Sequence, residues 1–134
     1  RSYSSLIMST LKVNNLQDIN GANNSTPDEI ANGRAKAWVH MNGTGTISIK
    51  NSYNISSITD NATGKYTATM SITMSDNLYC VVGGGSQNVQ NDNVMGFFPS
   101  TTTSFKLQSN GSTGNFSTFE DAAFMSGAVF GDLA

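Results

Sequence analysis

Charged residues are scarce in this chain. They make up 12% of the 134 residues, and seven Lys and Arg stand against nine Asp and Glu, so the formal net charge is -2. Proteins that bind nucleic acid neutralise phosphates with clustered basic side chains, whereas the seven here are scattered singly. The composition therefore argues against nucleic-acid binding. The polar residues are mainly Asn, Ser, Thr and Gly, which favour strands and tight turns over long helices.

Cysteine and long apolar runs are also scarce. Cys80 is the single cysteine, so no disulfide can form within the chain. It lies in an apolar run at residues 78–82, which predicts a small buried side chain. No apolar run approaches the roughly 18 residues typical of a membrane span, and the first residues lack the pattern of a secretory signal. We expect no membrane insertion and no cofactor.

Regular alternation is the strongest pattern that the sequence does contain. In residues 64–75, GKYTATMSITMS, the apolar side chains share one parity: Tyr66, Ala68, Met70, Ile72 and Met74. This alternation predicts a strand with one buried face and one solvent face. Turn residues at 60–64 precede it, and the apolar parity slips between Ile55 and Ile58. We therefore predict a β-meander over residues 44–75, with a bulge near Ser56 and Ser57.

One short helix is predicted at residues 25–33. Thr26 is suited to the N-cap, Pro27 to the first helical position, and Glu29 to a capping box with Thr26. Gly33 is placed to end the helix. A helix of this length is not stable alone, so we expect it to pack on another part of the chain.

Further strands are predicted at residues 34–41, 94–98, where Pro99 ends the strand, and 102–108, where Phe105 and Leu107 point inward. Residues 78–82 are apolar on both parities, which is typical of central strands or of strands at a subunit contact. Residues 121–130 are also apolar on both parities, and they predict a terminal strand that is buried on two sides. Glycines 83–85 lead into a polar stretch without a nearby Lys or helix. They predict a surface loop rather than a phosphate site.

The strand at residues 34–41 is unusual because Trp38 and His40 lie on the parity opposite to the small apolar residues. A Trp there implies that this face is covered as well, by the N-terminal arm, by the helix or by another subunit. His40 is the only histidine, and no second ligand lies at a metal-binding spacing. We expect it to be structural and expect no metal site.

Together these elements predict an all-β protein, an antiparallel β-sandwich of jelly-roll-like type with an extended N-terminal arm and one short helix. Residues 1–24 form the arm and residues 25–134 the single sandwich domain. Met8-Ser9-Thr10 is typical of a natural start, so residues 1–7 are expected to be either an added segment or part of a leader.

The sequence resembles a domain found in many tailed bacteriophages, especially those that infect cyanobacteria and other marine bacteria. The matching pieces are GRAKAWVHMNGTGTISIKNSYNISSITDNATGKYTATMSITM at residues 33–74 and AVFGD at residues 128–132. The lead-in MSTLKVNNLQDINGANNSTPDEI at residues 8–30 is similar to the start of small virion proteins with this domain. The resemblance implies a non-enzymatic virion protein of tail-fibre type that assembles as a homotrimer and contributes to host attachment.

The residues suggest where such a protein would make contacts. A domain of this size buries only about two-thirds of its unfolded surface, and contacts around a threefold axis would cover the remainder. The predicted subunit interface comprises Trp38, Val81, Phe124, Val129 and Phe130. Amide side chains pair well with sugar hydroxyls, so a host surface glycan or protein is expected to meet a polar loop. That predicted ligand-binding loop comprises Gln87, Asn88, Gln90, Asn91, Asp92 and Asn93.

Two alternatives remain open. A capsid decoration (cement) protein would stabilise the phage head, with the N-terminal arm reaching other virion proteins. A glycan depolymerase would need two carboxylates placed around the scissile bond. The acidic residues are few, and several, such as Asp28 and Glu29, are explained by capping or turn chemistry. We therefore expect no catalytic residues and no enzyme.

Overall fold

The computed structural model describes residues 10–22, 24–86, 94–111 and 118–134. The chain divides into two units, Arg1–Gly33 and Arg34–Ala134. The only helix of the described residues, α1 (Pro27–Gly33), belongs to the first unit, although the sequence analysis grouped it with the sandwich.

Helix α1 begins with the predicted capping box. The Glu29 backbone amide donates to Thr26 Oγ1 at 3.2 Å, and the Thr26 backbone amide donates to Glu29 Oε2 at 2.7 Å. The hydrogen bond from the Thr26 backbone also lowers the pKa of the Glu29 carboxyl. The predicted cap is confirmed. None of the residues of α1 is buried within the described chain.

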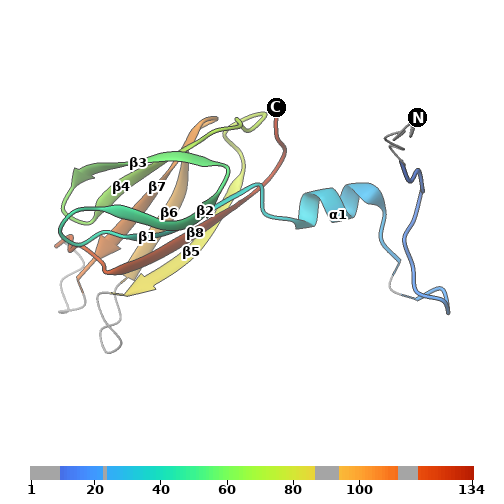
Figure 1. The fold of residues 1–134 in the computed structure, drawn as a ribbon, viewed down its shortest axis with the longest axis horizontal. Helices are drawn as coiled ribbons and strands as arrows, with labels where there is room; N and C mark the ends of the chain where they lie inside the picture. The colour runs from blue at the N-terminus through green and yellow to red at the C-terminus, as the bar shows by residue number, and fades with distance from the viewer. Residues whose placement is uncertain (1–9, 23, 87–93, 112–117) are drawn as a thin grey trace, which may run out of the picture. The chain divides into compact units, whose positions relative to one another are not determined.

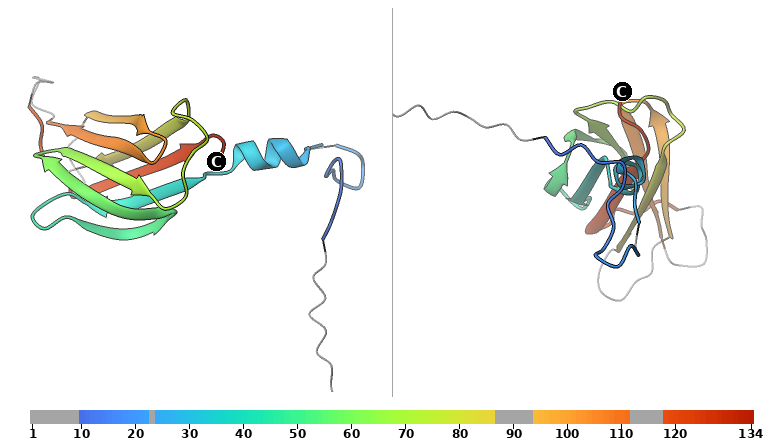
Figure 2. Two further views of the ribbon diagram at one scale, coloured as in Figure 1. Left: turned by 90° about the horizontal axis from the view of Figure 1, so that it is seen from above. Right: turned by 90° about the vertical axis from the view of Figure 1, so that its right-hand side faces the viewer.

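The second unit is an antiparallel β-sandwich, as predicted. One sheet has the order β2-β1-β8-β5 and the other the order β3-β4-β7-β6. Figures 1 and 2 show the two layers. The strands are β1 (Ala37–Asn42), β2 (Ser48–Tyr53), β3 (Ile55–Ala62), β4 (Lys65–Met70), β5 (Cys80–Ser86), β6 (Val94–Thr101), β7 (Ser104–Asn110) and β8 (Phe124–Phe130).

The core lies between the sheets and follows the predicted alternation. Its largest fully buried side chains include Tyr66 from β4, Phe105 and Leu107 from β7, and Met41 and Val39 from β1. Every second residue of β1 and β4 is buried, because successive side chains of a strand point to opposite faces.

Strand β4 is shorter than the alternation predicted. It ends at Met70, and Ile72 is 52% exposed instead of buried. The Asn54 side chain uses both hydrogen-bonding groups of the Ile72 backbone. Its Nδ2 donates to the Ile72 carbonyl, and the Ile72 amide donates to its Oδ1 at 2.7 Å. Ile72 therefore cannot continue the strand pairing. Met74 is still buried, where an isolated bridge joins it to Leu133.

Asn54 also explains why the predicted meander is wrong. Strands β2 and β3 are consecutive, but they belong to different sheets. Asn54 lies between them with a φ of 55°, a left-handed conformation that Asn tolerates better than most residues. Its Nδ2 also lies 3.1 Å from the Lys36 carbonyl. The chain therefore passes from one sheet to the other at Asn54. The predicted bulge is confirmed, because the pairing of β3 with β4 shifts register between Ile55 and Ser57.

Strand β5 differs from the sequence-based predictions in three respects. It is an edge strand, not a central one, and the glycines expected in a loop are part of it. Gly83 and Gly85 pair with Gly127 and Met125 of β8, and a Cβ on Gly83 would lie 2.6 Å from the Phe97 ring. Glycine is therefore required because the opposite sheet packs against this backbone. Cys80 is exposed rather than buried, because it lies at the edge on the face away from the core.

Strand β6 continues through Pro99, where it was predicted to end. It is an edge strand, so the missing backbone donor of proline is tolerated there. The pairing with β7 shifts register between Pro99 and Thr101.

Strand β8 is central but not buried on two sides as predicted. It pairs with β1 and β5, and Met125, Gly127 and Val129 point into the core. The alternate residues point outward, and Phe124 among them is exposed. One face of this sheet is therefore open.

A buried tyrosine holds one end of the sandwich together. The Tyr66 hydroxyl lies 2.7 Å from Asp121 Oδ1 and 2.9 Å from the Gly43 carbonyl. The same carboxylate oxygen accepts the Gly64 amide at 2.7 Å, within the turn between β3 and β4. Burial, and then the hydrogen bond to Asp121, raise the pKa of Tyr66 well above its usual range.

Tyr66→Phe should lower the free energy of unfolding at neutral pH by about 1–3 kcal/mol, because the Gly43 carbonyl and the partly buried Asp121 carboxylate lose the hydroxyl donor that they share. The folded chain also holds the Tyr66 proton more tightly than the unfolded chain, in which tyrosine titrates near pH ~10. This stabilisation is complete below that pH and is lost as the pH rises above it. Urea unfolding as a function of pH should therefore show a weaker alkaline decline in the variant.

Part of the alkaline decline in stability should remain in Tyr66→Phe, because burial raises the pKa of Tyr79 as well. Tyr53→Phe is the matched control, since the Tyr53 ring is exposed. Equal alkaline slopes for the parent chain and Tyr66→Phe would contradict this role of Tyr66.

Candidate functional site

The open face of the β2-β1-β8-β5 sheet is the candidate site. We call it the outer face, meaning the side chains of these strands that point away from the core. Its centre is a row that crosses all four strands in register, because Trp38 pairs with both Tyr53 and Ala128, and Ala128 pairs with Val82. Tyr53 and Val82 are exposed, and Trp38 and Ala128 are partly exposed. An apolar row therefore faces solvent.

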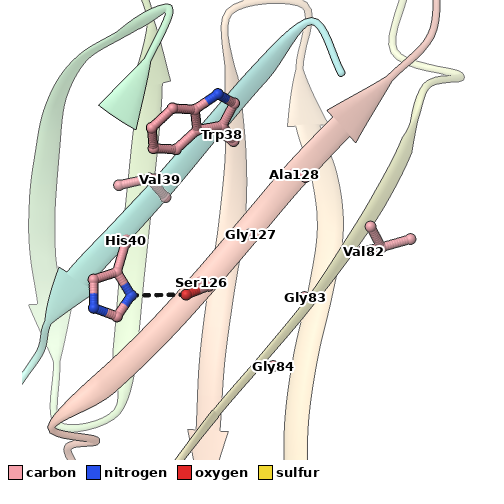
Figure 3. A pocket seen from close by; sticks show the side chains of 9 residues that line it. All are labelled: Trp38, Val39, His40, Val82, Gly83, Gly84, Ser126, Gly127 and Ala128. Carbon is pink, nitrogen blue, oxygen red and sulfur yellow. Dashed lines mark hydrogen bonds between the residues drawn. The ribbon is translucent and has the colours of Figure 1, made fainter. Parts of the chain in front are cut away.

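The row contains a shallow depression of about 260 Å³ (Figure 3). Trp38 and His40 rise from β1 on one side and Val82 from β5 on the other. Between them the surface is made of small residues: Gly83, Gly84, Ser126, Gly127 and Ala128. The depression exists because strands β5 and β8 carry almost no side-chain bulk at these positions.

A polar pair borders the depression. His40 Nδ1 lies 2.8 Å from Ser126 Oγ, and the His40 ring stacks on Phe124 with the centroids 6.4 Å apart. Activation of a serine by histidine usually needs a third group that orients the imidazole. No carboxylate of the described residues hydrogen-bonds to His40. The hydrogen bond to Ser126 and the stacking on Phe124 therefore fix the orientation of the imidazole on the sheet.

The structure separates the predicted interface residues into two groups. Trp38, Phe124 and Phe130 are on the outer face, as a subunit contact requires. Val129 is 0% exposed in the core, so its side chain is not available to another subunit and this assignment is wrong. Val81 pairs with Val129 and shares its inward parity, and its partly buried side chain packs against the core rather than belonging to the outer face.

Sequence reasoning missed Tyr53, Val82 and Ala128 as parts of this face. The row depends on register between strands far apart in the sequence, and local alternation carries no information about it. The signal that was available was Trp38, whose position opposite the small core residues indicated a second apolar face.

The predicted ligand-binding loop, comprising Gln87, Asn88, Gln90, Asn91, Asp92 and Asn93, lies outside the described residues. Among the residues that are described, no group of three His, Cys, Asp or Glu side chains could hold a metal ion. No helix of that part of the chain is long and apolar enough to cross a membrane.

Comparison with known proteins adds no relative. No protein-family model, no curated protein and no solved structure matches the chain.

Proposed function

We propose that the chain is a non-enzymatic structural protein of a phage virion, of tail-fibre type, that assembles as a homotrimer and contributes to host attachment. The observation that carries the proposal is the outer face, where an uncovered Trp, Phe, Tyr and Val lie together on a regular sheet. Aromatic residues are enriched at protein interfaces. Such a surface is a means of assembly and needs no catalytic group.

The size of the outer face fits this use. Four strands about 4.8 Å apart and about six residues long at 3.3 Å per residue cover roughly 400 Å². The apolar row occupies part of this area, and exposed apolar patches of a few hundred Å² on a monomer are often functional. A subunit that contacts two neighbours in a ring would use this face together with a second surface.

The resemblance to tailed-phage proteins supports the rest of the proposal. The resembling segment, residues 33–74, supplies β1 to β4, and Trp38 of the outer face lies within it. Attachment to a host glycan or protein is assigned to the polar side chains predicted from the sequence, namely Gln87, Asn88, Gln90, Asn91, Asp92 and Asn93.

The capsid decoration protein remains the second candidate, and one observation favours it. None of the described residues in the first unit is buried, and Leu11, Leu16 and Ile19 are exposed there, Ile19 at 99%. Exposed apolar residues outside a core suit an arm that becomes ordered on a neighbouring protein. Such an arm would fasten the protein to other virion components.

Copy number separates the two candidates. Quantitative mass spectrometry of purified particles should find at most a few tens of copies per virion, since a fibre is attached only at the tail. Hundreds of copies would contradict the tail-fibre proposal and support decoration of the head. Absence of the chain from the particles would contradict both.

A further inference from the structure

A protruding leucine lies next to the open sheet. Leu78 lies two residues before the start of β5 and is 85% exposed, more than any other large apolar side chain in the described part of the second unit. The backbone is fixed at Leu78 and at the residue that follows it. Its backbone amide donates to Asp76 Oδ1 at 2.8 Å, and the following residue, Tyr79, is buried with its hydroxyl 2.9 Å from the Thr101 carbonyl. A side chain presented on fixed backbone loses little conformational freedom when it binds.

We infer that Leu78 of one copy inserts into the depression between Trp38 and Val82 of a second copy. This inference rests on the proposed self-assembly and names its contact. The depression has apolar walls and a volume of about 260 Å³. For comparison, a core cavity of about 150 Å³ accepts a benzene molecule. One branched aliphatic side chain therefore fits.

Charge favours the same pairing. The four strands around the depression, all within the described residues, carry Lys50 and His40 and no Asp or Glu. Asp76 accompanies Leu78 in its turn. A leucine flanked by a carboxylate is therefore complementary to an apolar hollow on a sheet that carries a lysine and no carboxylate.

The fit and the charge point to another copy as the partner, since Leu78 does not reach the depression of its own chain. Leu78 leads into β5 four residues before Val82, and at about 3.3 Å per residue of extended chain their Cα atoms lie roughly 13 Å from each other. The contact joins two different surface patches, so it is heterologous. Repeated around an axis, a heterologous contact can close a ring, as a trimer requires.

Cysteine cross-linking of the full chain tests the contact. In a Cys80→Ser background, a chain carrying both Leu78→Cys and Val82→Cys should give a covalent trimer after mild oxidation, seen on a non-reducing gel. A mixture of the two single-cysteine chains should give a covalent dimer. Either single-cysteine chain alone should remain uncross-linked.

Each other result has a definite meaning. Cross-linking of Val82→Cys alone would overturn the inference, because the face would then pair with itself. A covalent dimer from the doubly substituted chain would support the contact but contradict the trimer. No cross-link in a chain that light scattering shows to be trimeric would overturn the inference and leave the proposed assembly standing. A monomer would count against both.

A second substitution avoids any effect of the introduced cysteines. Leu78→Ser in the otherwise unchanged chain should weaken self-association at least tenfold. Ile72→Ser is the matched control, since Ile72 is also an exposed aliphatic residue preceding β5 but has no assigned partner. Equal effects of the two substitutions would overturn the assignment of Leu78.

Discussion

Gly83→Ala should lower the free energy of unfolding by about 3 kcal/mol, whereas Gly84→Ala should leave it unchanged or raise it slightly. A Cβ on Gly83 would lie 2.3 Å from the Ser126 carbonyl and 2.6 Å from the Phe97 ring, which packs from the opposite sheet. A Cβ on Gly84 would meet nothing within 4 Å. Two neighbouring glycines in one strand thus differ only in the face to which a side chain would point.

Urea unfolding of the two variants measures the difference directly. The comparison is internal, because both substitutions add the same methyl group to the same strand and change chain flexibility equally. If Gly83→Ala were tolerated as well as Gly84→Ala, these glycines would form the surface loop that their composition suggests. Strand β5 would then not be packed against β6.

Ala128→Asp should weaken self-association at least about 100-fold, the effect expected when an unpaired charge is buried in an interface. Ala128 lies at the centre of the apolar row and lines the depression. Its side chain points away from the core, so the single subunit should still fold. Sedimentation velocity over a range of concentrations would measure the association constant.

Thr59→Asp supplies the control for added charge. Thr59 is exposed on β3, which belongs to the other sheet, and it carries no part of the outer face. This variant should associate like the parent chain. An equal loss of association in both variants would show that net charge, rather than the outer face, governs assembly.

The elements that sequence predicted well are those whose signal is local. Alternation placed Val39, Tyr66, Ala68, Phe105 and Leu107 in the core, and all five are buried. Side-chain direction in a strand changes with every residue, so a few consecutive positions are enough to define it. The capping box of α1 is local for the same reason, since Thr26 and Glu29 are three residues apart.

The elements that sequence predicted poorly depend on partners far along the chain. Whether β2 and β3 share a sheet is decided at Asn54, whose side chain bonds the backbones of Lys36 and Ile72, both 18 residues away. The apolar run at residues 78–82 was predicted to be a central strand or a strand at a subunit contact, but within the sheet β5 has a neighbouring strand on one side only. Neither fact can be read from the residues nearby.

The candidate site was predictable in part for the same reason. The sequence identified three large apolar residues of this face, because their strands carry more apolar side chains than one core can bury. These residues are Trp38, Phe124 and Phe130. Val129 was misassigned because its run, residues 121–130, is apolar on both parities, so only the observed pairing with Val81 shows which parity is inward. The row through Tyr53 and Val82 required the full register of four strands.

Light scattering on the intact chain at micromolar concentration tests the central claim most directly, namely that the outer face is a contact between subunits. We predict a mass three times that of the 14.2 kDa chain, which falls to a single chain in Ala128→Asp and is retained in Thr59→Asp. A mass of one chain that does not change as the protein is concentrated would contradict the claim. So would a trimer that persists in Ala128→Asp.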